Sequence, residues 1–436
     1  MSVQLGVREF DVIISNPDYK TEYKYLPQAV FDDLETFIKE YAAEGDSADA
    51  LEFLRFGYKR GVGDTISISN YVGLIQTSKG NQIEVLPKID FKTADDEDAA
   101  TKRVFIKMLR SMKDFSMKKF NMADLQTDRM NLYEIFINMY IQETAELTKK
   151  GLKSDYVRQE DNLGFFKGKL LVNQHIKANL AHREKFYVGY DEFLQDCSEN
   201  RIIKSTLLKL ESFSEDTRNL LQLKRLLTYF EMVSQSTSYE KDFANITINR
   251  GNKSYADILR WSKVFLKNKS FTTFSGDSNS RALLFPMEKV FEAYVARELN
   301  KLLPSGWDLS SQDNTYYLFD SPRQFALRPD IVITRDDGHQ IILDTKWKRL
   351  YDNPNKNYGI SAQDMYQMYA YATKYDTKDI FLLYPVTDEM RGRDDISFQS
   401  YKEALIADIR VFFVDVADIE NNLGNLVKKM NDLGQK

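Results

Sequence analysis

Two aspartates and a lysine in one short stretch have the residue types of a metal-assisted catalytic site. In RPDIVITRDDGHQIILDTKWK, residues 328–348, Asp330 precedes one apolar run, and Asp344 and Lys346 end the next. Carboxylates held close together repel each other and raise one pKa, unless a shared cation favours both anions. Mg²⁺ prefers oxygen ligands of this kind. The stretch therefore predicts either a Mg²⁺ site or a solvated hairpin, because Pro-Asp followed by Asp-x-Lys also arises by chance.

A β-hairpin would position these side chains. The runs IVIT and IILDTKW are β-branched and apolar, and the Asp-Gly at 337–338 between them is a strong hairpin-turn signal. A two-residue loop there places Asp330 opposite Thr345, with the two carboxylates as neighbours. Alternation along the second strand places Asp344 and Lys346 on one side of it.

Helices on either side of the hairpin add further candidates. FPMEKVFEAYV has the apolar spacing of an amphipathic helix, with Glu288 and Glu292 beside the apolar stripe as ligands or as ordinary solvated side chains. SAQDMYQMYAYA begins with an N-cap serine and carries Gln367 and Tyr371 four residues apart on one face. With two later strands and a last helix, the order of elements is that of a compact α/β module.

Composition limits the class of protein. The chain has 436 residues, 43% hydrophobic and 29% charged, which is typical of a globular protein of two or three domains. A net charge of −5 leaves any contact with nucleic acid to local patches. The single Cys197 excludes an internal disulfide and a multi-cysteine zinc site. The N-terminal residues resemble neither a signal peptide nor a membrane span, so we expect a cytoplasmic protein with no membrane contact.

Patterns along the chain predict three regions. Residues 1–98 mix a helix with strands, and a Lys-Gly-Asn turn at 79–81 joins the strands YVGLIQT and QIEVLPKI. Residues 99–272 form a mainly helical middle domain, in which stripes of Met and aromatic residues are typical of core packing. TFSGDSNSR, residues 273–281, reads as a loop or linker, and residues 281–436 form the α/β module.

The motifs in the α/β module resemble those of the PD-(D/E)xK nuclease fold. That fold has a helix with a glutamate, then Pro-Asp, then Asp-x-Lys, then a second helix. The matching residues are Glu292, Pro329-Asp330 and 344–346. The Q-x-x-x-Y pattern of Gln367 and Tyr371 is similar to an extra motif of RecB-type members.

Longer segments narrow the resemblance to the McrC family, the nuclease subunit of McrBC-type restriction systems. LDTKWK, FPMEKVFEAYV and DMYQMYAYA are similar to that family, and so are NYVGLIQTSKGNQIEVLPKI, FFKGKLLVNQHIKANL and YDEFLQDCSENRIIK upstream. The likeness spans about residues 70–384 and keeps the family's order of motifs. FKGKL at 166–170 departs from it, because the family often has an arginine-rich version there.

The resemblance implies a Mg²⁺-dependent DNA endonuclease subunit that cleaves modified, methylated foreign DNA. An McrB-like AAA+ GTPase ring would be its partner, would bind the GTP, and would have its hydrolysis stimulated. The implied metal ligands are Asp330, Asp344 and Glu292, and the implied catalytic set is Asp330, Asp344, Lys346, Glu292 and Gln367. Candidate contacts with double-stranded DNA are Tyr371, Lys348 and Arg349. The alternatives are that Tyr371 positions the active-site strand and that Lys348 and Arg349 form a solvated strand end. The candidate docking element is the turn of Thr77, Ser78, Lys79, Gly80, Asn81 and Gln82, at the exposed tip of a hairpin.

Two other functions remain open at this point. One is a non-cleaving, GTPase-activating docking subunit whose nuclease site has decayed, against which the intact residues Asp330, Asp344 and Lys346 argue. The other is a stand-alone RecB-like DNA repair nuclease.

The absence of a phosphate loop from the sequence leads to a first prediction. Gly-Lys occurs only at Gly168-Lys169 and is followed by leucine, so no G-x-x-x-x-G-K-[ST] motif is present. We expect the isolated protein to show no saturable binding in an equilibrium titration with a fluorescent GTP analogue. Micromolar affinity would contradict the assignment of GTP binding to a partner.

Overall fold

The structure is a computed structural model that describes residues 3–44, 53–77, 79–91, 96–112, 130–267, 281–393, 396–402 and 405–433. The chain forms two compact units. The first combines Met1–Ser116 and Thr127–Arg129 with Phe271–Lys436, and the second combines Met117–Gln126 with Met130–Ser270. No helix in the described ranges is long and apolar enough to cross a bilayer.

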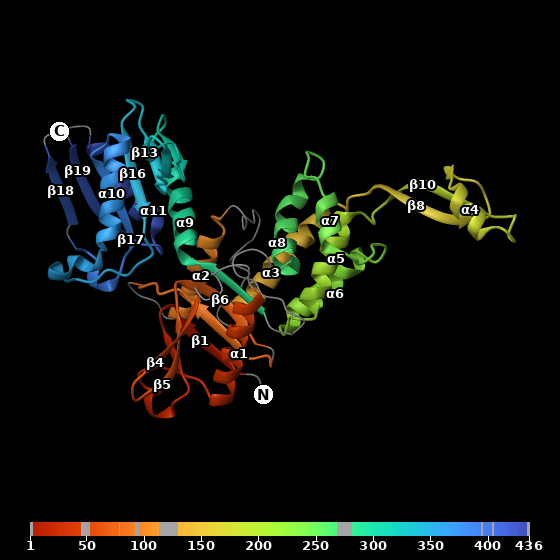
Figure 1. Cartoon of the computed structure of the whole chain (residues 1–436), viewed down its shortest axis with the longest axis horizontal. Helices are drawn as coiled ribbons and strands as arrows, with labels where there is room; N and C mark the ends of the chain where they lie inside the picture. Colours follow the sequence, from red (N-terminus) through yellow and green to blue (C-terminus); the bar gives the residue numbers. More distant parts are fainter. Residues whose placement is uncertain are drawn as a thin grey trace. The chain divides into compact units, whose positions relative to one another are not determined.

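The N-terminal part of the first unit contains two four-stranded sheets (Figure 1). One sheet has the order β3 (Lys24–Tyr25), β2 (Val12–Ile14), β5 (Gly63–Ile68) and β4 (Leu54–Lys59). The other has the order β1 (Gln4–Arg8), β7 (Gln82–Leu86), β6 (Tyr71–Gln76) and β11 (Arg281–Pro286). The apolar stripe of α1 (Gln28–Glu44) joins both sheets in one core, which includes Val7, Ile13, Leu34, Phe37, Ile66, Ile75 and Leu284.

Strand β11 connects this part to the C-terminal residues. It pairs antiparallel with β6 although it lies more than 200 residues later in the chain, and it leads directly into α9 (Met287–Leu302). The predicted amphipathic helix is confirmed as α9, whose apolar stripe is buried. The first element expected in the middle domain, α2 (Glu97–Leu109), instead contacts α9 and β7 of the first unit.

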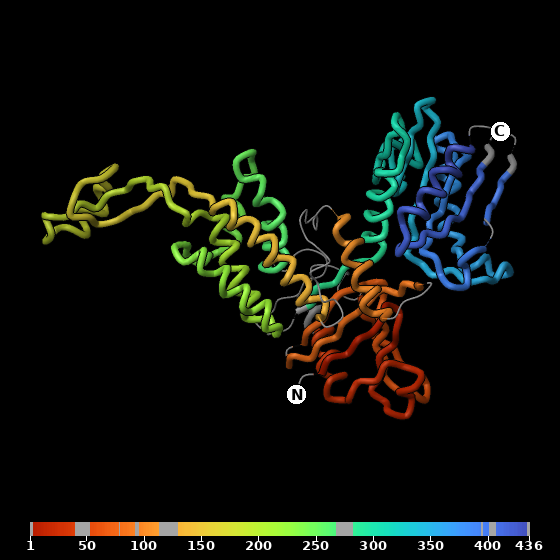
Figure 2. Tube along the Cα trace, turned by 180° about the vertical axis from the view of Figure 1, so that it is seen from behind, coloured from red at the N-terminus to blue at the C-terminus, as the bar shows by residue number. Residues whose placement is uncertain are grey.

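The C-terminal part is built on a six-stranded mixed sheet (Figures 1 and 2). Its order is β12 (Asp308–Ser311), β15 (Ile331–Thr334), β16 (Gln340–Thr345), β17 (Asp379–Pro385), β19 (Leu405–Val414) and β18 (Ile396–Lys402). Strands β16, β17 and β19 are parallel. Helix α10 (Ala362–Tyr375) packs on one face, while α11 (Ile419–Asp432) and α9 contact each other and the sheet. A separate hairpin pairs β13 (Tyr317–Asp320) with β14 (Arg323–Ala326).

The predicted hairpin is confirmed as β15 and β16, but its predicted register is wrong by one residue. Ile331 pairs with Leu343, so continuing the register places Asp330 opposite Asp344 instead of Thr345. The turn has three residues instead of two, because Arg335 N donates to His339 O and Gly338 takes a left-handed φ of 81°. Glycine adopts this conformation without strain, and three-residue turns of this kind are common in hairpins. Because opposite residues share a face, the corrected register puts both carboxylates on one side.

The second unit is a helical bundle that carries a β-sheet extension. The bundle contains α3 (Leu132–Lys149), α5 (Ser198–Glu211), α6 (Thr217–Tyr229), α7 (Tyr239–Asn245) and α8 (Ala256–Lys267). The extension, which we call the finger, consists of β8 (Asp155–Leu163), β9 (Lys169–Leu170), α4 (Val172–Ala178) and β10 (Phe186–Leu194) (Figure 1). The helices agree with the expected helical middle region, whereas the sheet of the finger was not expected.

The proposed docking turn at 77–82 joins the antiparallel strands β6 and β7, as predicted, but it is largely buried. Thr77, Asn81 and Gln82 are buried, and Asn81 Nδ2 donates to Asp33 Oδ2 of α1 at 2.7 Å. Strand β6 also pairs with β11 on its other side, so these strands belong to a larger sheet. Lys79 is exposed and Gly80 is partly buried, whereas Ser78 lies outside the described residues. The predicted hairpin is therefore confirmed, whereas the predicted exposure of its turn is wrong for Thr77, Asn81 and Gln82.

Candidate functional site

Asp344 and Lys346 form the centre of the candidate site. Asp344 lies near the carboxyl end of β16 with only 1% of its surface exposed, and its Oδ2 is 2.6 Å from Lys346 Nζ. Burial, reinforced by the negative charge of Asp330, raises the pKa of Asp344 to about 7, although Lys346 opposes the shift. Burial alone would lower the pKa of Lys346, but the Asp344 carboxylate raises it. The pair therefore concentrates charge where little water screens it.

Thr345, the residue between Asp344 and Lys346 in the chain, holds the side chain of Asp330 in place. Asp330 Oδ2 accepts hydrogen bonds from Thr345 N at 2.8 Å and from Thr345 Oγ1 at 2.6 Å. The backbone oxygen of Asp330 accepts from Gln312 N at 2.9 Å. Thr345 thus fixes one oxygen of Asp330 next to the Asp344–Lys346 pair. Sequence reasoning had given Thr345 no role, although it is the middle residue of the Asp-x-Lys motif.

Glu292 reaches the same site through a glutamine that sequence reasoning missed. Gln312 Nε2 lies 2.6 Å from Glu292 Oε1 and 3.3 Å from Asp330 Oδ1, so its amide bridges two carboxylates. Burial and then the charge of Asp330 raise the pKa of Glu292 to about 7. Gln312 has a left-handed φ of 53°, an uncommon and strained conformation for a non-glycine residue. By contrast, Glu288 on the same helix is exposed.

Helix α10 supports the lysine through a chain of hydrogen bonds. Lys346 Nζ donates to Gln367 Oε1 at 3.2 Å, and Gln367 Nε2 donates to the hydroxyl oxygen of Tyr371 at 2.7 Å. The structure therefore brings both predicted α10 residues to the site. Tyr371 is only 1% exposed, so the proposed direct contact between Tyr371 and DNA is wrong. Its hydroxyl instead fixes the Gln367 side chain.

The segment after Lys346 is held by the N-terminal part of the same unit. Trp347 Nε1 donates to both oxygens of Glu9, at 2.9 and 2.8 Å, and Glu9 also accepts from Lys88 N at 2.7 Å. Burial raises the pKa of Glu9 to about 7. Arg349 makes a bidentate pair with Asp90, at 2.8 and 2.7 Å. The N-terminal strands thus fix the backbone immediately beyond the candidate catalytic lysine.

The remaining predicted cation also has an acidic partner. Lys348 Nζ lies 2.9 Å from Asp364 Oδ2, and Asp364 sits in the first turn of α10. The side chain of Lys348 is nevertheless 42% exposed. Lys348 and Arg349 each have an acidic partner, so they do not form a solvated strand end. The side chain of Lys348 is exposed enough to bind a ligand.

The carboxylate oxygens of the site are the kind of ligand that a hard cation such as Mg²⁺ prefers. Asp330 and Asp344 lie on one side of the hairpin, and burial, followed by the negative charge of Asp330, raises the pKa of Asp344, which a bound cation would oppose. Among the described residues, no three acidic, histidine or cysteine side chains form a ready metal cluster. Mg²⁺ is commonly held by one or two carboxylates, with water and substrate phosphate completing its shell. Asp330 and Asp344 could supply these two carboxylates. Glu292 would not contact the metal directly, because Gln312 bridges it to Asp330.

A comparison with known families identifies the chain. Residues 66–385 match the family model described as McrBC 5-methylcytosine restriction system component. The chain belongs to this family. No curated protein matches the chain.

Solved structures of McrBC complexes contain chains with a similar fold. One is described as a refined half-complex from a tetradecameric assembly of Thermococcus gammatolerans McrB AAA+ hexamers with bound McrC. Its matching chain has a TM-score of 0.69 at 18% identity, covering 98% of this chain and 100% of that one. A cryo-EM structure of the Thermococcus gammatolerans McrBC complex matches with a TM-score of 0.50 at 20% identity, covering 70% of this chain and 89% of the other. At these identities the likeness shows a shared mixed α/β fold.

The raised pKa values predict how stability depends on pH without metal. Asp344, Glu292 and Glu9 have a folded pKa of about 7, against about 4 in unfolded chains. Between these values the folded protein binds more protons than the unfolded chain, so these three groups make stability fall as pH rises. In EDTA, we expect a lower melting temperature at pH 7 than at pH 5, by on the order of a few °C. Added Mg²⁺ should stabilise more at the higher pH, and thermal melts across the pH range measure both effects.

Matched variants isolate the two carboxyl groups. Asp344→Asn and Glu292→Gln should each flatten the fall in melting temperature with pH. Glu288→Gln, at an exposed position on the same helix, should leave it unchanged. Parental slopes in both site variants would show that neither group titrates as the structure implies.

Proposed function

We propose that the chain is a Mg²⁺-dependent DNA endonuclease subunit with a PD-(D/E)xK site. The observation that carries the proposal is the convergence of Asp330, Asp344 and Lys346 at one end of the β15–β16 hairpin, supported by Gln367 from α10. Membership of a 5-methylcytosine restriction family supports methylated DNA as the substrate and the cytoplasm as the place of action. The intact ion pair and its supporting hydrogen bonds argue against a decayed site.

Each residue has a distinct task in the proposed hydrolysis. Asp330 and Asp344 would hold Mg²⁺, which would supply polarisation of the scissile phosphate and activation of water. Lys346 orients the attacking water and offsets negative charge as it develops on the phosphate. Gln367 keeps the ammonium group of Lys346 directed into the site. Thr345 keeps one Asp330 oxygen fixed, so the two carboxylates need little rearrangement.

An AAA+ GTPase ring of the McrB type is the proposed partner. The similar McrC chain comes from an assembly of McrB AAA+ hexamers with bound McrC, and this chain has no phosphate loop of its own. We propose that this chain docks on such a ring and stimulates its GTP hydrolysis.

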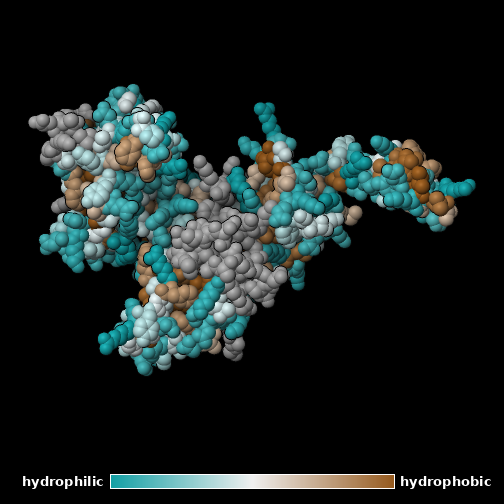
Figure 3. Space-filling model, viewed as in Figure 1, coloured by the Kyte–Doolittle hydropathy of each residue, from teal (hydrophilic) through white to brown (hydrophobic). Residues whose placement is uncertain are grey.

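The finger is a better candidate than residues 77–82 for the docking surface. Figure 3 shows apolar side chains gathered at the end of the finger that carries α4. The exposed apolar residues there are Phe165 (61%), Phe166 (58%), Val172 (55%), Ile176 (55%) and Leu180 (80%). Clustered apolar side chains on a narrow extension are unfavourable in water and commonly mark protein contacts.

Substitutions at the centre of the site test the nuclease proposal. Asp344→Asn keeps the side-chain volume but removes a ligand charge, and Lys346→Ala removes the cation beside the attacked phosphate. We expect either variant to lower Mg²⁺-dependent cleavage of methylated DNA by the reconstituted complex at least about 100-fold. GTPase stimulation should stay near parental, because the proposed docking surface lies in the other compact unit.

The control is Asp337→Asn, in the exposed turn of the same hairpin, which should cleave like the parent. DNA nicking, GTP hydrolysis and a thermal melt are measured on the same preparations. Parental cleavage by Asp344→Asn would refute the nuclease assignment, whereas an unfolded variant would show that the carboxylate is structural.

The docking surface leads to a separate prediction. The double variant Phe165→Ser and Leu180→Ser should reduce co-purification with the GTPase and its stimulation at least about tenfold, because apolar anchors dominate such contacts. Leu221→Ser, at a 70% exposed position on α6 of the same unit, is the matched control and should bind normally. Equal loss in both variants, or loss in neither, would place docking elsewhere.

A further inference from the structure

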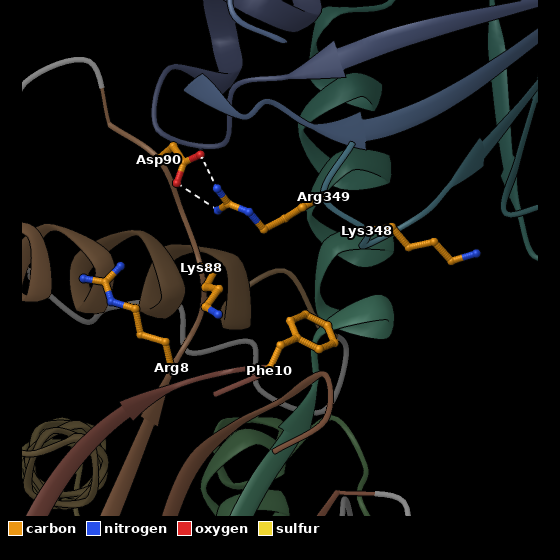
Figure 4. A pocket seen from close by; sticks show the side chains of 6 residues that line it. All are labelled: Arg8, Phe10, Lys88, Asp90, Lys348 and Arg349. Atoms are coloured by element: carbon orange, nitrogen blue, oxygen red, sulfur yellow. Dashed lines mark hydrogen bonds and ion pairs between the residues drawn. The ribbon is translucent and has the colours of Figure 1, made fainter. Parts of the chain in front are cut away.

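A cavity beside the candidate site is lined by side chains from two distant parts of the chain. Its volume is about 650 Å³, which lies within the usual range of ligand sites, about 300–1,000 Å³. In Figure 4, Lys88 points toward Phe10 and Arg349 reaches Asp90, whereas the Lys348 side chain extends away from Phe10. The lining residues are Arg8, Phe10, Lys88, Asp90, Lys348 and Arg349.

The lining combines four cations with one aromatic ring and one carboxylate, a combination that suits a nucleotide. Arg349 is bound to Asp90, whose carboxylate also accepts from Asp388 N, so this pair serves the fold. The other three cations have acidic neighbours as well: Arg8 with Glu97 and Asp98, Lys88 with Asp11, and Lys348 with Asp364. Ion pairs between partly exposed side chains contribute little, so a phosphate can replace a carboxylate as partner.

Phe10 is the most unusual residue of the cavity. It has a left-handed φ of 64°, which is unfavourable for a large side chain, and it is 48% exposed. Hydrogen bonds hold this turn, because Asp11 N donates to Arg8 O and Phe10 N donates to Ile68 O. A glycine would adopt this backbone conformation without strain. Phe10 therefore makes the folded state less stable than a glycine would, and its ring is only partly buried. Such a residue is typical of a ligand contact.

Residues 346–349 lead from the proposed nuclease site to the cavity, because Lys346 belongs to the site and Lys348 and Arg349 line the cavity. The chain turns tightly here, since Lys348 N donates to Lys346 O, and the side chains of Lys346 and Lys348 both contact α10, at Gln367 and Asp364 respectively. Trp347 points the other way and is fixed by Glu9. The cavity therefore lies within three residues of the candidate catalytic lysine along the chain.

We propose that this cavity binds an unpaired nucleotide of the DNA strand, with its base stacked on Phe10 and a neighbouring phosphate on Lys88. Aromatic rings beside cations bind single-stranded nucleic acid in this way, because every base has a face that can stack. The inference rests on the proposed nuclease function. It adds the N-terminal strands to the substrate-binding surface.

Binding of a labelled oligonucleotide to the full-length chain tests the inference without cleavage. The probe is a short fluorescein-labelled oligothymidylate, measured by anisotropy in EDTA, with a duplex of equal length for comparison. Phe10→Gly should bind the single strand roughly tenfold or more weakly while melting no lower than the parent, because glycine relieves the strained backbone. Phe10→Tyr, which keeps the stacking face, should bind like the parent. Lys88→Gln should reduce the slope of log affinity against log salt by about 0.7.

Phe56→Leu is the matched control, because Phe56 is also exposed, at 43%, but lies on β4 and is not part of the cavity. Its affinity should equal that of the parent. Parental affinity in Phe10→Gly, absence of saturable binding in the parent, or equal loss in Phe56→Leu would each overturn the inference. Reduced co-purification with the GTPase and unchanged oligonucleotide affinity in Phe10→Gly would overturn it in favour of a protein contact. Failure of the nuclease function would appear separately, as parental cleavage by Asp344→Asn.

Discussion

The ion pair between Asp344 and Lys346 is the interaction on which the site depends. A buried carboxylate is unfavourable unless an opposite charge or hydrogen bonds compensate for it. Strand β16 has paired neighbours on both sides, which removes water from Asp344 and leaves Lys346 as its direct counter-charge. The remaining features follow from this pair, because Thr345 fixes Asp330 and Gln367 fixes the ammonium group. The fold thereby concentrates unfavourable negative charge at one place, which is the physical requirement for holding a divalent cation.

The N-terminal part of the first unit completes this arrangement. Trp347 contacts Glu9 through its indole nitrogen and Phe291 through its ring, with ring centroids 5.2 Å apart. One side chain therefore connects the N-terminal strands, α9 and the end of β16. Strand β11 adds a covalent connection, because it belongs to the N-terminal sheet and continues into the helix that carries Glu292. The C-terminal sheet alone would lack both supports, so the first unit is best regarded as one functional body.

The sequence predicted elements with strong internal periodicity, and it failed where distant residues decide the structure. The helices α1, α9 and α10 and the strands β15 and β16 were found from apolar spacing and turn signals. The register was wrong because the left-handed Gly338 lengthens the turn by one residue, and an Asp-Gly pair fits either turn. The buried docking turn was missed because β11, which covers β6, comes from far along the chain. Gln312 and Glu9 carry no local signal, since only the folded chain brings them to the site.

Several unfavourable local features lie at or near the candidate site, and they support a function there. Glu9, Glu292 and Asp344 all have a pKa raised to about 7 by burial. Gln312 and Phe10 hold left-handed backbones without being glycine. Each feature makes the folded state less stable than a simpler residue would, and natural proteins break such local rules mainly where binding or catalysis requires it. A purely structural interface would be expected to replace these residues by apolar or glycine residues, so their presence together favours a surface shaped for an anionic substrate and its cation.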